Sequence, residues 1–231
     1  MLVVGCIHGT ECAGIAIARA LERVRTRADL WVVPNLNPDG YALGSRQNAR
    51  GVDLNANWSS GWRGGGRPWD TYYPGPRPFS ERETRIARNL ILRIRPRVTI
   101  WYHHHMDLVW AWGPPSTAAG RIYARAAGMR FYHHHWLHGT ATNWQNHHLP
   151  GSASFTVELP AGSLSPQQVR RPGARGPVAR HGDRLATRLR ERRGGLMPAP
   201  LFRSPGHRPR RGWQRARIVA SALEAKANIS R

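Results

Sequence analysis

Several polar clusters in this sequence combine side chains that bind metal ions, transfer protons or hold anions. The first cluster is His8-Gly9-Thr10-Glu11. An imidazole and a carboxylate three residues apart, in a turn that enters a helix, can reach one metal ion, and both are normal zinc ligands. The alternative is a surface histidine beside an acidic residue that the helix dipole stabilises. This pair alone leaves both interpretations open.

A run of histidines forms the second cluster, His103-His104-His105. A histidine at a strand end is a suitable third zinc ligand, and three protein ligands leave one position open for water in a catalytic site. Nine of the 12 histidines lie between residues 103 and 148, including a second run at 133–135. A histidine-rich loop that binds metal ions without function is therefore the alternative.

The third candidate is a single carboxylate, Glu158, inside the apolar run SFTVELP. Burial of a carboxylate is costly unless it has a partner or a function. In an apolar cleft beside a metal ion it would act as a general base with an adjusted pKa. An edge-strand glutamate that faces water is the alternative.

The fourth cluster runs from Arg46 to Trp58 and contains arginine and amide side chains. Such groups suit the recognition of carboxylates and oxyanions. A polar turn region has a similar composition, so the residue types alone do not decide between the two.

The elements that must position these clusters follow from the hydrophobic pattern. Apolar runs predict strands, and apolar residues at helical spacing predict helices, the second of which is expected to begin with a Ser80–Glu83 capping box. The predicted strands span 2–6, 30–36, 98–103 and 154–159, and the helices span 11–25, 80–93 and 116–128. Asn37-Pro38-Asp39-Gly40 predicts a turn, and residues 41–79 predict a long irregular stretch. The alternation predicts an α/β fold with a largely parallel or mixed sheet between helices, whose ligands bind beyond the carboxyl ends of the strands.

Composition limits the class of protein. The chain has 231 residues, of which 40% are hydrophobic, which suits one domain with a sizeable core. Its two cysteines, Cys6 and Cys12, exclude a disulfide scaffold and a four-cysteine zinc site. Apolar runs stay below the roughly 20 residues of a membrane helix, so no membrane span is expected. Without a visible signal peptide the chain as written indicates a cytoplasmic protein, with the cell envelope as the alternative if the N-terminus is truncated.

Charge is the second compositional feature. The 35 basic and 13 acidic residues give a net charge of +22, and residues 166–231 form an arginine-rich tail of uncertain order. A basic tail can bind nucleic acid or anionic lipid. Because zinc-finger, RNP and basic-zipper patterns are missing from the sequence, we expect no specific nucleic-acid partner.

Several motifs follow one another in a characteristic order: HGTE, NPDG, RxNxxGVDLN, TIWYH and FTVEL. This order resembles the zinc carboxypeptidase family of the carboxypeptidase A type. The segments PFSERET and GTATNWQNHHLPGSASFTVELPAG resemble its bacterial branch, which includes murein peptide amidases. The resemblance covers about residues 1–165 and implies a catalytic domain with a mixed eight-stranded sheet. It also implies that the family's earliest strands are missing from the N-terminus.

The resemblance assigns a role to each cluster. It implies that His8, Glu11 and His103 hold one Zn²⁺ per chain. Glu158 matches the general base that activates the zinc-bound water. Arg46 matches the arginine that polarises the scissile carbonyl and stabilises the oxyanion.

Substrate recognition departs from the family pattern. Asn55 matches a residue that helps to hold the terminal carboxylate of the substrate. The family pattern DLNRN reads Asp-Leu-Asn-Ala-Asn here, so Ala56 replaces the arginine that clamps this carboxylate. A charge-assisted bond of that kind contributes roughly 1.5–3 kcal/mol. Arg50 and Arg63 are nearby candidates for a replacement.

Two further positions complete the comparison with the family. Thr142 falls where the family lines its side-chain pocket, so no charged specificity group is expected there. The catalytic tyrosine has no clean match, and Tyr132 is the nearest candidate. The resemblance implies a zinc metallocarboxypeptidase that acts on a peptide or muropeptide. The alternatives are a related amidohydrolase that needs no terminal carboxylate and an inactive metal-binding remnant; the oligomeric state is left open.

Overall fold

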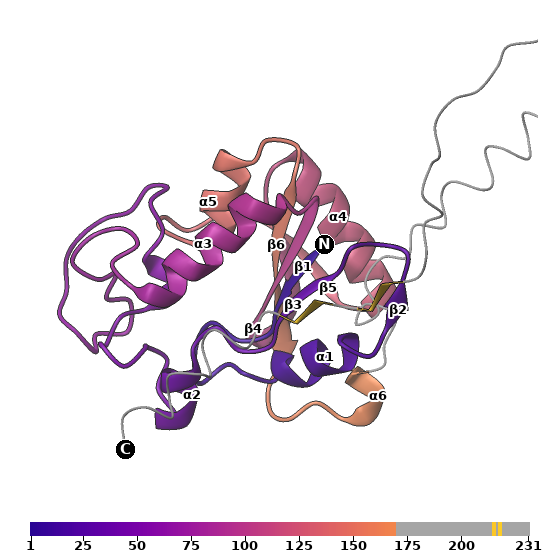
Figure 1. Cartoon of the computed structure of the whole chain (residues 1–231), viewed down its shortest axis with the longest axis horizontal. Coiled ribbons are helices and arrows are strands. Elements are labelled where there is room, and N and C mark those ends of the chain that lie inside the picture. The colour runs from indigo at the N-terminus through magenta and orange to yellow at the C-terminus, as the bar shows by residue number, and fades with distance from the viewer. Residues whose placement is uncertain (170–213, 216, 219–231) are drawn as a thin grey trace, which may run out of the picture.

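The computed structural model describes residues 1–169, 214–215 and 217–218, and these residues form a sheet with helices on both faces (Figure 1). The strands are β1 (Leu2–Val4), β2 (Arg25–Thr26), β3 (Trp31–Val33), β4 (Val98–Ala111), β5 (Arg130–His133), β6 (Ala153–Pro160), β7 (Gln214–Arg215) and β8 (Arg217–Ile218). Within the described residues the main sheet has six strands, against the eight that the resemblance implied, and β2 pairs separately with β7.

The long strand β4 explains how the sheet becomes mixed. Its first half, residues 98–105, runs parallel to β6, and its second half pairs with β6 in the reverse direction. Glu158 has two backbone partners, His103 in the first half and Leu108 in the second, so β6 lies between the two halves of β4. The chain reverses near Asp107, which has a left-handed φ of 50°. The predicted mixed α/β sheet is thus confirmed, and His103 and Glu158 are neighbours.

Helices cover the two faces of this sheet and bury separate apolar clusters. The helices are α1 (Gly14–Leu21), α2 (Pro38–Leu43), α3 (Arg82–Ile94), α4 (Pro114–Ala127), α5 (Ala141–His148) and α6 (Pro166–Val169), with a 3₁₀ turn η1 (Leu54–Ala56). One cluster includes Leu21 of α1 and Tyr123 of α4, and the other includes Ile91 of α3 and Trp144 of α5. Packing on both faces fixes the strands whose ends carry the candidate site.

Two local predictions were wrong. Asn37 to Gly40 were predicted as a turn, but they begin α2, because the Asn37 side chain accepts a hydrogen bond from the Gly40 amide and Pro38 suits the first helical turn. The Ser80–Glu83 capping box does not form. The helix α3 begins after Glu81 without a side-chain cap, and the Ser80 hydroxyl donates to the Glu81 carboxylate instead.

Part of the predicted tail lies against the sheet. Arg217–Ile218 pair in parallel with β3, and Gln214–Arg215 pair with β2. The remaining tail, residues 170–213, 216 and 219–231, lies outside the described residues, so the boundary at residue 165 stays a prediction. Within the part that the structure describes, no helix is long and apolar enough to cross a membrane.

Candidate active site

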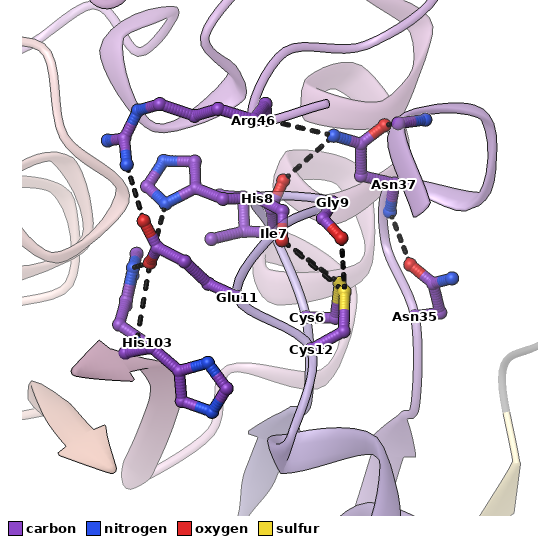
Figure 2. The surroundings of a disulfide bond; sticks show 12 residues. Cys6, Ile7, His8, Gly9, Glu11, Cys12, Asn35, Asn37, Arg46 and His103 are labelled. Atoms are coloured by element: carbon purple, nitrogen blue, oxygen red, sulfur yellow. Dashed lines mark hydrogen bonds and ion pairs between the residues drawn. A yellow bond between two sulfur atoms is a disulfide. The ribbon is translucent and has the colours of Figure 1, made fainter. Parts of the chain in front are cut away.

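A short loop between β1 and α1 carries the first two candidate ligands (Figure 2). A disulfide joins Cys6 to Cys12, so His8 and Glu11 lie within a closed ring of the chain. The Glu11 amide donates to the His8 carbonyl at 2.8 Å. Gly9 has no room for a side chain, because a Cβ there would overlap the backbone of α2. The covalent link, this turn and the close packing together fix the shape of the loop.

The three predicted zinc ligands converge at this loop. One donor atom each from His8, Glu11 and His103 lies within 4.8 Å of the other two, and within the described residues this is the only such group of three. Nδ1 of His8 lies 2.9 Å and Nδ1 of His103 lies 3.0 Å from Oε2 of Glu11, and Figure 2 shows the three side chains turned toward one another. Nδ1 of His8 is buried without a hydrogen-bond partner. A buried set of imidazole and carboxylate donors with an unsatisfied nitrogen fits Zn²⁺.

Asp53 supports this set and was missed by the sequence analysis. Its Oδ1 lies 3.0 Å from Nε2 of His8 and accepts from the Asn55 amide at 2.8 Å. Its Oδ2 lies 3.1 Å from Arg46. A carboxylate on the far nitrogen of a metal-binding histidine fixes its tautomer and orientation. An acidic residue within the polar stretch 46–58 was the available signal, but no predicted strand placed it near His8.

Arg46, which the resemblance matches to the oxyanion-stabilising arginine, lies beside the three candidate ligands. Its guanidinium bonds both Glu11, at 2.5 Å, and Asp53, and its side chain stays 25% exposed. The guanidinium also lies 5.3 Å from the ring centre of Tyr72. These contacts hold a cation at the rim of the site, where it can meet a developing negative charge.

Protonation of the ligand set follows from burial and pairing. Burial alone would raise the pKa of Glu11, but the close contacts of its carboxylate with the imidazoles of His103 and His8 outweigh burial and hold that pKa well below its usual range. Burial has the opposite effect on His8 and by itself would lower its pKa. The interactions of His8 with Asp53 and Glu11 outweigh burial, so the pKa of His8 is raised. For His103 burial dominates and lowers the pKa. Glu11 is therefore a carboxylate at neutral pH, as a metal ligand requires.

Glu158 is the buried carboxylate beside the set. It lies on β6 next to His103, only 9% of its surface is exposed, and Oε2 has no hydrogen-bond partner. Burial, with a contribution from the charge of Glu11, raises the pKa of Glu158 to about 7. A carboxylate with this pKa can gain and lose a proton near neutral pH, which is what a general base requires.

Two adjoining cavities surround these residues. The metal cavity, of about 330 Å³, is lined by the three ligands, Glu158 and Thr142 among others. The Arg63 cavity, of about 370 Å³, is lined by Ala56, Arg63 and His138 among others. Both cavities share the lining residues Arg46, Asn55, Tyr72, Leu137 and Thr140.

Two other residues that the sequence singled out, Asn55 and Arg50, differ in their position relative to the cavities. Asn55 lines both cavities, and its side-chain oxygen accepts from the Ala141 amide at 3.1 Å. Arg50 lines neither cavity and pairs with Glu81 at 3.5 Å.

The structure places a different tyrosine at the site from the one that the sequence suggested. Tyr132, on β5, packs against Trp110, on β4, with ring centres 5.7 Å apart, and it lines neither cavity. Tyr72 lines both cavities instead. It was missed because it lies in the irregular stretch 41–79, which has no periodicity from which its position could be inferred.

The fold and the site together define a class: an α/β protein with three candidate metal ligands gathered near its strand ends and a buried carboxylate beside them. The sequence pattern of zinc carboxypeptidases matches residues 1–121. The chain therefore belongs to the zinc carboxypeptidase family.

Individual relatives agree with this placement. Murein peptide amidase A of Escherichia coli K12 is 35% identical over 115 residues, which are 44% of this chain and 48% of that protein. Carboxypeptidase B of Astacus astacus is 32% identical over 111 residues, 39% of this chain and 37% of that protein. The chain thus spans less than half the length of these curated relatives.

Solved structures show the same fold. The murein-tripeptide amidase of Escherichia coli O157 superimposes with a TM-score of 0.63 at 25% identity, over 76% of this chain and 81% of that chain. Carboxypeptidase A of Helicoverpa armigera superimposes with a TM-score of 0.58 at 22% identity, over 71% of this chain and 53% of that chain. The amidase matches support the bacterial branch, and the insect enzyme supports the fold.

Proposed function

We propose that this protein is a zinc-dependent metallopeptidase that hydrolyses the bond before the C-terminal residue of a peptide such as a cell-wall muropeptide. The observation that carries the proposal is the convergence of His8, Glu11 and His103 with the desolvated Glu158 in one cavity. The named relatives, a murein peptide amidase and a carboxypeptidase, support the substrate class.

The cofactor follows from the donor set. His8, Glu11 and His103 would hold one Zn²⁺, which when bound acts as a Lewis acid and lowers the pKa of a coordinated water. Asp53 keeps His8 in the tautomer that leaves Nδ1 free to bind the metal.

Two side chains then carry the proton and the charge. The Glu158 carboxylate, which lines the same cavity as the three ligands, accepts a proton from the attacking water and returns it to the leaving nitrogen. The Arg46 guanidinium donates hydrogen bonds to the carbonyl oxygen as negative charge develops on it. Its contacts with Glu11 and Asp53 hold it in position before substrate arrives.

Residues around the cavity bear on the substrate. Asn55 would contact the terminal carboxylate, and the neutral Thr142 would line the side-chain pocket. A second candidate function is an amidohydrolase that needs no terminal carboxylate, which Ala56 favours because it removes the family's arginine. Equal turnover of a free acid and its amide would support this second candidate.

Turnover by a Glu158→Gln variant tests the proposal. The zinc-loaded full chain is assayed on N-acetylated tripeptides, and the variant should lose roughly 1000-fold or more in kcat because it lacks the general base. Its zinc content should stay the same, since Glu158 is outside the ligand set. Glu22→Gln, a carboxylate next to α1 and away from both cavities, is the matched control and should retain full activity.

Two outcomes would contradict the proposal. Retained turnover in Glu158→Gln would exclude Glu158 as the base. A parent chain that holds zinc but cleaves none of the peptides would instead favour the metal-binding remnant.

A further inference from the structure

The Arg63 cavity has a positively charged wall that the proposed catalytic roles do not use. The Arg63 guanidinium lines the cavity, and the contact that it makes is with Nε2 of His138, at 3.3 Å. An arginine has five N–H donors in a planar fork, so the contact with His138 uses only a small part of the hydrogen-bonding capacity of Arg63. Ala56 contributes only a methyl group to the same wall.

Charge inside the Arg63 cavity is not balanced by a free carboxylate. Asp53 is the acidic residue that lines it, and Asp53 is 1% exposed. Both Asp53 oxygens are already engaged, one by His8 and the Asn55 amide and the other by Arg46. An incoming anion would therefore meet Arg63 without competition from a neighbouring acid.

Two loops hold Arg63 and His138 in this position. The Trp58 amide donates to the Gly139 carbonyl at 2.9 Å, and the Gly139 amide donates to the Ser60 carbonyl at 2.9 Å. The Asn143 side chain donates to the same Ser60 carbonyl at 3.0 Å. Three hydrogen bonds thus fasten the loop before Arg63 to the segment that carries His138.

Close packing at Gly61 adds to this fastening. Gly61 has a left-handed φ of 68°, and a Cβ there would lie 2.5 Å from Nδ1 of His138. The His138 ring therefore rests directly on the Gly61 backbone, two residues before Arg63. The pair is part of a built cavity wall, although both side chains are exposed at its mouth.

Resting on the proposed function, we propose that Arg63, together with His138, forms the subsite that binds the carboxylate of the substrate. Bidentate hydrogen bonding from a guanidinium to a carboxylate supplies both affinity and orientation. Glu158 and the metal ligands line only the metal cavity, whereas Arg63 lines only the Arg63 cavity. The substrate class is a peptide with an acidic end that reaches from the scissile bond in one cavity into the other.

Binding to an inactive form tests this subsite separately from turnover. The full-length, zinc-loaded Glu158→Gln chain is titrated calorimetrically with a set of acetyl-Ala-Ala-Xaa tripeptides, each as the free acid and as the amide. In that background Arg63→Ala removes the subsite. Arg67→Ala is the matched control, because it removes the same charge from the same loop at a residue that lines neither cavity.

The acid-to-amide ratio of affinities decides the result. With Arg63 present the best acid should bind roughly 10- to 150-fold more tightly than its amide, as for a charge-assisted hydrogen bond. Arg63→Ala should bring this ratio close to one, Arg67→Ala should leave it unchanged, and Arg63→Lys should give an intermediate ratio because a lysine lacks the bidentate fork. A purely structural role of Arg63 would weaken acids and amides alike.

The proposed subsite is rejected if the acid-to-amide ratio of affinities is unchanged in Arg63→Ala. It is also rejected if the chain with Arg63 intact binds no acid more tightly than the corresponding amide. Hydrolysis by the parent chain is measured in parallel. Hydrolysis with an unchanged ratio in Arg63→Ala would reject the subsite alone. A ratio that depends on Arg63 without any hydrolysis by the parent would reject the proposed function alone.

Discussion

The metal cavity and the Arg63 cavity share five lining residues, yet different parts of the fold build them. His103 and Glu158 are on adjacent, hydrogen-bonded strands, and His8 and Glu11 follow a third strand in a disulfide-closed loop. Arg63 and the residues around it are on connecting loops, which tolerate substitution better than strands do. The comparison teaches that the residues predicted as zinc ligands, general base and oxyanion arginine all match the family pattern, whereas the pattern's carboxylate-clamping arginine is replaced by Ala56 and its tyrosine has no clean match.

The largest expected effect is the loss of zinc when the candidate ligands His8, Glu11 and His103 are disrupted. A His8→Ala/Glu11→Ala variant lacks two of the three donors, so zinc should fall from about one per dialysed chain to almost none. Replacement of His133, His134 and His135 by alanine is the control, because these exposed histidines are outside the ligand set. Zinc content is measured by atomic absorption. Equal loss in both variants would mean that the histidine-rich segments hold the metal.

The second prediction concerns the cost of burying Glu158. The pKa of about 7 in the fold exceeds the ordinary 4.5, so the protonated form stabilises the fold. This contribution is complete below about pH 4.5 and is lost as the pH rises through about 7. Glutamine mimics the protonated form. Metal-free Glu158→Gln should therefore exceed the parent in free energy of unfolding by roughly 3 kcal/mol at pH 8 and by about 1 kcal/mol at pH 5.

Urea unfolding at the two pH values, with a chelator present, measures this difference. Glu22→Gln serves again as the control and should show no such pH-dependent gain. A Glu158→Gln variant that is no more stable than the parent at pH 8 would show that the Glu158 carboxylate is well solvated in the fold.

The third prediction tests whether Asp53 supports zinc binding by orienting His8, without being a zinc ligand itself. Asp53→Asn keeps the size of the side chain but removes the charge that fixes His8 and pairs with Arg46. Zinc should bind about 10- to 100-fold more weakly, as expected for a carboxylate that supports a metal-binding histidine. Competition with a chelator measures the dissociation constant. Asp70→Asn, whose carboxylate bonds only within its own loop, should leave it unchanged; equal affinity in Asp53→Asn would remove the supporting role.

The same division between strands and loops explains what the sequence could predict. Apolar runs identify strands, and polar residues directly after them are expected at one edge of a sheet, so His8 and His103 could be placed there in advance. The family resemblance was needed to add Glu158, which lies inside its predicted strand. Asp53 and Tyr72 lie in the stretch 41–79, where turns rather than periodicity determine the path of the chain. Their positions depend on contacts between distant loops, which no local pattern encodes.

The smallest expected effect tests whether the two arginine positions serve one cavity. Ala56 and Arg63 line the same wall, so an arginine introduced at position 56 should regain part of the carboxylate binding that Arg63→Ala removes. In the inactive Glu158→Gln background, Ala56→Arg/Arg63→Ala should prefer acids over amides by about 10-fold, the lower end for a charge-assisted hydrogen bond. Ala56→Lys/Arg63→Ala is the matched control and should recover less, because a point charge lacks the guanidinium fork.

Since position 56 belongs to the 3₁₀ turn beside Asn55, a recovered preference would mean that the loops relocated an existing recognition role. An Ala56→Arg/Arg63→Ala variant that folds and binds zinc but shows no preference for acids over amides would give the opposite answer. Arg63 would then hold the carboxylate at a place that a side chain at position 56 cannot reach, and the two positions could not substitute for each other.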